Sequence, residues 1–179
     1  MENKQTQVLK IPKKRIAVVI GTSGETKKEL QEKTNTKINV TEEGEVEIQG
    51  DPFDAWITKK IIKAIGRGFS PRKALLLLNE GYMLEVIELN NWAKTEKSRL
   101  RLKGRVIGTE GKSKRTIEEI SQTYISVYGK TICIIGGIKN VLLAKRAVEM
   151  LLSGCKHTTI YNLLEKEQRK MRKEEILGG

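Results

Sequence analysis

The chain has 179 residues, which fits one ordinary domain or two small ones. Its 34 lysines and arginines outnumber its 22 acidic residues, and the net charge of +12 favours a polyanionic partner over a basic surface that only maintains solubility. Nucleic acid is the first candidate and an anionic membrane surface the second, but no membrane partner is expected, because no amphipathic stretch has the bulky apolar face that membrane binding needs. No apolar stretch approaches the ~20 residues of a membrane span, and two cysteines with one histidine cannot make an ordinary zinc site, so we expect a soluble, cytoplasmic protein without metal or cofactor.

The first half of the chain is expected to form a strand, two helices, two strands and a helix. Pro12 ends the first strand and suits the first turn of the next helix. Ile38 and Val40 alternate with polar residues, which indicates a strand. In chain order, the expected elements span residues 7–11, 13–20, 25–34, 37–41, 45–49 and 52–65.

A short apolar helix is expected next. Ser70 can cap this helix and Pro71 suits its first position, so that the helix spans residues 72–79. It contains four consecutive leucines at 75–78, a run too apolar for an exposed linker. We therefore expect this helix to dock between two modules.

The second half is expected to repeat the same order and to add a final helix. Residues 90–95 look like an insertion relative to the first half. The segment after them is ambiguous, because Leu100 and Leu102 alternate with basic residues as in a strand, but its match to the first half favours a helix. The expected elements are a strand at 84–89, helices at 96–107 and 115–122, strands at 124–128 and 131–135, and helices at 140–152 and 156–173.

One short sequence occurs twice, 87 residues apart: Val-Ile-Gly-Thr-Ser-Gly at 19–24 and Val-Ile-Gly-Thr-Glu-Gly at 106–111. Similar residues continue at the same offset, without a gap, over about thirty positions. This register matches Ile48 with Ile135, and the glycines at 50 and 137 with each other. Such self-similarity indicates two copies of one module.

Each copy carries a G-x-x-G loop between an apolar run and a charged amphipathic segment. Glycine has no side chain, so an extended backbone can approach it closely. The helix that follows begins with unpaired amide groups and a partial positive charge, and both features hold phosphates without reading sequence. A lone motif is equally typical of a helix–helix turn, but two copies in one register favour a nucleic-acid module.

The element order and the loop resemble the KH domain in its strand-first, type I form. Four further segments resemble the tandem KH proteins of small ribosomal subunit assembly, the partner-of-Nob-one (Dim-two-type) family in its short archaeal form: RGFSP at 67–71, LEVIEL at 84–89, YISVYGKT at 124–131 and HTTIY at 157–161. The resemblance covers about residues 7–165. It implies an α+β fold of two type I KH domains, each a three-stranded sheet packed on helices, plus a C-terminal helix.

We expect four parts along the chain. They are a first KH domain at 1–68, an interdomain helix or linker at 69–83, a second KH domain at 84–155, and a C-terminal helix and tail at 156–179.

The resemblance implies a single-stranded RNA-binding protein that acts near the 3′ end of the small-subunit rRNA precursor. It also implies two partners, the endonuclease that trims this end and the alpha subunit of translation initiation factor two. The alternative is a protein-interaction adaptor with weak, generic RNA affinity, and a steep dependence of binding on salt would distinguish the first function from the second.

No enzymatic activity is expected. Gly111-Lys112-Ser113 resembles the end of a nucleotide-hydrolysing P-loop, but that motif would need a glycine where Val106 stands. His157 has no neighbouring acid that would suggest a catalytic triad, although Cys155 lies two positions before it. Trp56 falls in the pattern of a closing helix and is expected in the core, whereas Trp92 could either stack on bases or pack inside.

The expected RNA-binding residues are the two loops and the basic side chains beside them. In the second copy they are Lys103, Arg105, Gly108, Thr109, Glu110, Gly111, Lys112, Lys114 and Arg115. In the first copy they are Gly21, Thr22, Ser23, Gly24, Lys27 and Lys28. The density of basic residues favours the second copy as the main clamp, although the carboxylate of Glu110 would repel a nearby phosphate.

Overall fold

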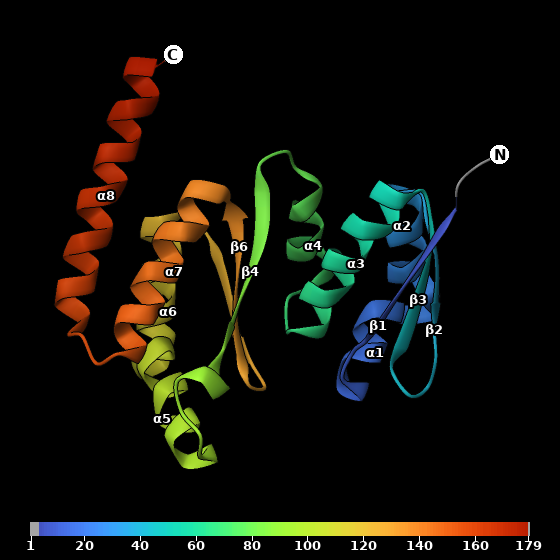
Figure 1. Cartoon of the computed structure of the whole chain (residues 1–179), viewed down its shortest axis with the longest axis horizontal. Helices are drawn as coiled ribbons and strands as arrows, with labels where there is room; N and C mark the ends of the chain where they lie inside the picture. The colour runs from blue at the N-terminus through green and yellow to red at the C-terminus, as the bar shows by residue number, and fades with distance from the viewer. Residues whose placement is uncertain (1–3, 179) are drawn as a thin grey trace. The chain divides into compact units, whose positions relative to one another are not determined.

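The computed structural model describes residues 4–178 and divides into two compact units, one up to Tyr82 and one from Met83 onward. Each unit has a three-stranded sheet with helices packed on it (Figure 1). The expected α+β class, the β-α-α-β-β-α order of each unit and the C-terminal helix are confirmed. None of the helices within residues 4–178 is long and apolar enough to cross a membrane.

The first unit has its central strand between two antiparallel neighbours, in the order β1-β3-β2. Val46 and Ile48 of the central strand are buried, while Glu45 is exposed, so the period-two pattern turns one face of the strand toward the helices. The elements are β1 (Gln5–Lys10), α1 (Lys13–Ile20), α2 (Glu25–Thr34), β2 (Lys37–Val40), β3 (Glu45–Gly50) and α3 (Pro52–Gly66).

The apolar segment after α3 packs against that helix. Its first part is α4 (Pro71–Ala74), where Oγ of Ser70 accepts a hydrogen bond from the amide of Lys73 at 3.4 Å. The four leucines then form a 3₁₀ turn, Leu75–Leu78, instead of continuing the helix. Both parts contact α3, and the expected docking of this segment between modules stays a prediction.

The second unit has the same topology, with the sheet order β4-β6-β5. Its elements are β4 (Tyr82–Glu88), α5 (Glu96–Ile107), α6 (Lys112–Ser121), β5 (Tyr124–Tyr128), β6 (Thr131–Gly137), α7 (Ile138–Leu152) and α8 (His157–Gly178). Three of these helices differ from the sequence expectation: α6 begins three residues earlier than 115, α7 begins two residues earlier than 140, and α8 continues to Gly178 instead of ending at 173. The α6 start follows directly from the repeat, since α2 begins immediately after its own loop.

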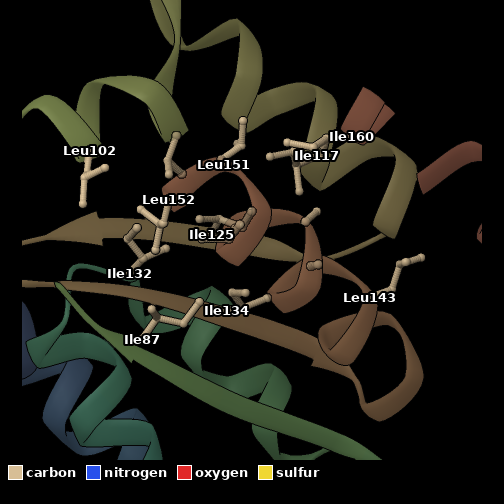
Figure 2. Packing of buried hydrophobic residues seen from close by; sticks show 14 of the residues in the cluster. Ile87, Leu102, Ile117, Ile125, Ile132, Ile134, Leu143, Leu151, Leu152 and Ile160 are labelled. Carbon is tan, nitrogen blue, oxygen red and sulfur yellow. The ribbon is translucent and has the colours of Figure 1, made fainter. Parts of the chain in front are cut away.

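The core of the second unit lies between its sheet and its helices (Figure 2). Ile125 of β5 and Ile132 of β6 lie among side chains such as Leu151 of α7. Helix α8 contributes Ile160 and Leu164, which are both fully buried. Burying one such side chain stabilises a protein by about 1.5–3 kcal/mol, so α8 is an integral part of this unit.

The ambiguous segment 96–107 is the helix α5, as the repeat indicated. Leu102 and Val106 are one helical turn apart and both are buried, whereas Leu100 is 67% exposed. In a strand, Leu100 and Leu102 would share a face, but in a helix they diverge. Thr95 caps the helix, because its Oγ1 accepts a hydrogen bond from the amide of Ser98 at 3.1 Å.

The repeat is not free of gaps, and this corrects the register expected from the sequence. In the first hairpin Ile38 pairs with Ile48, but in the second Ile125 pairs with Ile134 and not with Ile135. The second hairpin turns through two residues, 129–130, and therefore has one residue fewer than the first. Identical neighbours, Ile-Ile and then Gly-Gly, conceal this deletion in the sequence.

Glycine packing gives independent support for the shifted register. A Cβ on Gly50 would lie 2.8 Å from Cγ2 of Thr36, and a Cβ on Gly136 would lie 3.0 Å from Cγ2 of Thr123. The structural equivalent of Gly50 is thus Gly136, and the sequence match to Gly137 was wrong.

Candidate nucleic-acid interface

The two G-x-x-G loops have the same backbone conformation. The first glycines, Gly21 and Gly108, have φ/ψ of 76°/175° and 73°/177°. The third positions, Ser23 and Glu110, are both left-handed, with φ of 53° and 52°. The two copies therefore keep one loop geometry although a serine in one stands where the other has a glutamate.

The two glycines of each loop are required for different reasons. A Cβ on Gly108 would lie 2.7 Å from Cβ and 2.8 Å from the amide nitrogen of Ser113, and a Cβ on Gly21 would clash with Thr26. A Cβ on Gly111 would meet nothing within 4 Å, so only its φ of +73° favours glycine. The first glycine packs the loop against the next helix, and the second allows the chain to turn into it.

The loops place exposed residues directly before the N-termini of α2 and α6. Thr22, Ser23, Thr109 and Glu110 are exposed. Each loop passes straight into a helix of ten residues, whose N-terminus carries a partial positive charge. This arrangement can hold the phosphates of an extended strand through the main chain.

Three of the five predicted basic side chains around the second loop are available for phosphates. Lys112 and Arg115 are exposed and Lys103 is half-buried, and none of the three has a hydrogen-bond or ion-pair partner within residues 4–178. The other two, Arg105 and Lys114, are engaged inside the unit.

Arg105 closes the C-terminal end of α7. Its Nε donates to the carbonyl of Leu151 at 3.0 Å, and its NH2 group donates to the carbonyl of Cys155 at 2.7 Å. The Arg105 carbonyl in turn lies 2.9 Å from Nε2 of His157, at the start of α8. Arg15 makes the equivalent pair of hydrogen bonds at the end of α3, so both arginines hold two helices of their unit together. The expected contact of Arg105 with RNA stays a prediction.

Lys114 is paired with Glu118, a residue that the sequence analysis did not single out. The Lys114 Nζ to Glu118 Oε1 distance is 3.1 Å, and both side chains are mostly buried. The same Oε1 accepts a hydrogen bond from the amide of Ile125 at 2.7 Å, which fixes the start of β5. The sequence contained a signal for this residue, because Gln31 and Glu118 are both hydrogen-bond acceptors and are separated by the 87-residue offset of the repeat.

In the first copy, neutral Gln31 replaces this glutamate and accepts from the amide of Ile38 at 2.8 Å. Lys27 therefore has no carboxylate partner within residues 4–178, unlike Lys114. Lys28 is exposed and lies 4.0 Å from Glu32, a surface pair of little energetic weight. The second loop therefore exceeds the first in available basic side chains by less than the sequence suggested.

The two tryptophans are both partly exposed. Trp56 is 46% exposed on the outer side of α3, so the expectation that it lies in the core was wrong. The buried face of α3 includes Ala55, Thr58 and Ile62, whereas Trp56 lies outside it. Trp92 is 39% exposed. Within residues 4–178, no group of three or more histidine, cysteine, aspartate or glutamate side chains could hold a metal ion.

Comparison with known proteins gives matches to both units. The family model for the second KH domain of PNO1, described as a eukaryotic type KH domain (KH-domain type I), matches residues 83–169, and the KH domain model matches residues 6–65. The chain is 44% identical to a KH domain-containing protein of Methanocaldococcus jannaschii over 96% of this chain and 78% of that protein.

Two further relatives carry names that refer to RNA. The chain is 31% identical to the pre-rRNA-processing protein pno1 of Schizosaccharomyces pombe, over 74% of this chain and 56% of that longer protein. A chain in the crystal structure of the a/eIF2alpha–aDim2p–rRNA complex from Pyrococcus horikoshii OT3 superposes with a TM-score of 0.88 at 44% identity, over 94% of this chain and 96% of that chain.

Proposed function

Because this chain belongs to the tandem KH-domain proteins of the PNO1 (Dim2-type) family, we propose that it binds single-stranded RNA and acts in small ribosomal subunit assembly. We place its binding site near the 3′ end of the small-subunit rRNA precursor. The observation that carries the proposal is the duplicated loop, in which the same left-handed backbone places exposed residues before a helix N-terminus in both units.

The second loop is proposed as the main phosphate clamp. Lys103, Lys112 and Arg115 support this ranking, while the carboxylate of Glu110 at the loop tip opposes it. Cations of the first loop, Lys27 among them, would then assist.

The alpha subunit of initiation factor two is proposed as a partner, because the related Pyrococcus protein was crystallised with a/eIF2alpha and rRNA. The rRNA-trimming endonuclease is proposed as a second partner from the family resemblance alone. An adaptor with weak generic RNA affinity remains the alternative function, and the large basic excess favours the RNA-binding one.

The test is fluorescence anisotropy with a labelled single-stranded RNA from the 3′ end of the host's small-subunit rRNA, about a dozen nucleotides long, since each KH loop clamps about four nucleotides. A shuffled RNA and the matching DNA serve as controls, at two salt concentrations. Tight binding of the native RNA alone supports the proposal. Equal, salt-sensitive binding of all three would leave a generic clamp, and no binding would favour the adaptor.

The ranking of the loops needs a matched pair of double variants. Thr109→Asp with Glu110→Asp should abolish binding, whereas Thr22→Asp with Ser23→Asp should only weaken it. Both variants end with two carboxylates at the loop tip, because Glu110→Asp keeps one and Thr109→Asp adds one, whereas the first loop gains both. These carboxylates repel phosphate, so equal losses of binding would contradict the ranking.

A further inference from the structure

The outer side of α3 exposes an aromatic pair that the proposed loops do not use. Phe53 is 69% exposed and Trp56 is 46% exposed, and their rings lie 5.9 Å apart at an angle of 35°. The chain has only two phenylalanines and two tryptophans, and one of each is placed here at the surface. Large apolar groups exposed side by side indicate an interaction surface.

Lysines follow the aromatic pair along the same helix. The Nζ of Lys60 lies 3.5 Å from the centre of the Trp56 ring, and burial lowers the pKa of this lysine. Lys59 and Lys63 are four residues apart, or about 6 Å along the helix axis. The acids of this region, Asp51 and Asp54, are confined to the start of the helix, and residues 56–67 include none.

A hollow of about 630 Å³ adjoins these lysines, between α3 and β1, which is an edge strand of its sheet. It has four basic lining residues and no acidic one. The lining residues are Val8, Leu9, Lys10, Ile11, Pro12, Lys59, Lys63, Gly66 and Arg67. Its charge suits a polyanion, and its lining includes no residue of the G-x-x-G loop of the same unit.

We propose that Phe53, Trp56, Lys59, Lys60 and Lys63 form a second contact for single-stranded RNA, separate from the G-x-x-G loops. Bases stack on the exposed rings, and the lysines and the hollow hold the phosphates. Single-stranded RNA repeats a phosphate, which the lysines can bind, and a base, which can stack on the rings. An acidic protein also offers negative charge, but it has no repeating flat group that would stack on the rings. This inference rests on the proposed function, since it extends the path of the same RNA.

The first experiment follows the emission of Trp56. In a Trp92→Phe background, Trp56 is the only tryptophan of the chain. Addition of a single-stranded RNA of about 24 nucleotides, long enough for several stacked bases, should quench this emission in proportion to binding. Absence of quenching at saturation, measured by anisotropy on the same sample, would overturn the inference.

The second experiment compares matched charge variants of the full chain. Lys59→Gln with Lys63→Gln removes two charges from α3, and Lys166→Gln with Lys170→Gln removes two exposed charges from α8. For single strands each lost phosphate contact lowers the slope of log K against log salt by about 0.7, so the α3 variant should lose about 1.4 and the α8 control should lose none. Circular dichroism checks that both variants fold.

The outcomes separate this inference from the proposed function. If loop variants abolish binding and the α3 variant matches the α8 control, the second contact is wrong while the proposed function stands. If the unaltered chain binds no RNA, both are wrong. Quenching by polyglutamate but not by RNA would assign the surface to an acidic protein and would also overturn the inference.

Discussion

The two glycines of the second loop should respond very differently to alanine. Gly108 has φ/ψ of 73°/177°, a region open essentially only to glycine, and a Cβ there would lie 2.8 Å from the amide nitrogen of Ser113. Gly111 has φ/ψ of 73°/13°, which alanine can adopt with strain, and its Cβ would meet nothing within 4 Å. The clash is with a backbone atom and cannot be relieved by a side-chain rotation.

The magnitudes follow from these two environments. Left-handed alanine costs about 1–2 kcal/mol, which is the whole penalty expected for Gly111→Ala. Gly108→Ala adds the backbone clash to a strain of about 1–3 kcal/mol, so we expect a loss of more than about 3 kcal/mol in the free energy of unfolding. The loss should be confined to the second unit.

Urea denaturation with a local reporter tests this difference. A Trp56→Phe background leaves Trp92 as the only tryptophan, and Trp92 lies in the second unit. The same substitutions in the first unit, Gly21→Ala and Gly24→Ala, should leave the Trp92 transition unchanged. If Gly111→Ala destabilised the second unit as much as Gly108→Ala, the close approach to Ser113 would not explain why position 108 requires glycine.

Three further predictions concern the pairs that the structure reveals. Glu118→Gln keeps an acceptor for the β5 amide and releases Lys114, so RNA affinity should rise and the slope of log K against log salt should grow by about 0.7; an unchanged slope would show that Lys114 does not reach a phosphate. Arg105→Ala should lower the free energy of unfolding by about 3–6 kcal/mol, because it removes two charge-assisted hydrogen bonds that contribute about 1.5–3 kcal/mol each. Arg105→Lys should not restore the lost stability, and thermal and urea unfolding can check both variants. The hydrogen bond that Lys145 donates to the Glu85 carboxylate raises the pKa of Lys145, so the folded state holds this proton more tightly than the unfolded state. The stabilisation is complete below the ordinary pKa of 10.5 and is lost as pH rises through the higher folded-state pKa. The difference in stability between the native chain and Lys145→Gln should therefore shrink only in strong alkali, and a difference that shrank at neutral pH would contradict this assignment.

The module and most of its elements could be predicted from local patterns in the sequence. The duplicated loop placed two copies, and the bounds of α1 and α2 agree with the expected ranges. The repeat also resolved α5, where local alternation pointed to a strand. These features are local or recur at a fixed offset, so periodicity and turn residues carry enough information to predict them.

Which charged groups are available at the loops depends on contacts between distant parts of the chain. Arg105 and the carbonyls it binds are 46 and 50 residues apart, and no local pattern indicates that the end of α7 lies within reach of α5. The engagement of Lys114 depends likewise on a glutamate whose oxygen is fixed by the β5 amide. Hydrophobic spacing also left Trp56 in the core, because it cannot tell the edge of a buried helical face from its centre.

The hairpin register shows the same limit most directly. Ile134 and Ile135 are identical in sequence, as are the two glycines that follow them, so sequence matching cannot choose between offsets. Only the pairing of Ile125 with Ile134 and the contact of Gly136 with Thr123 fix the equivalence. The sequence thus determines which local structures form, while the distances between elements far apart in the chain decide which side chains remain free to bind RNA.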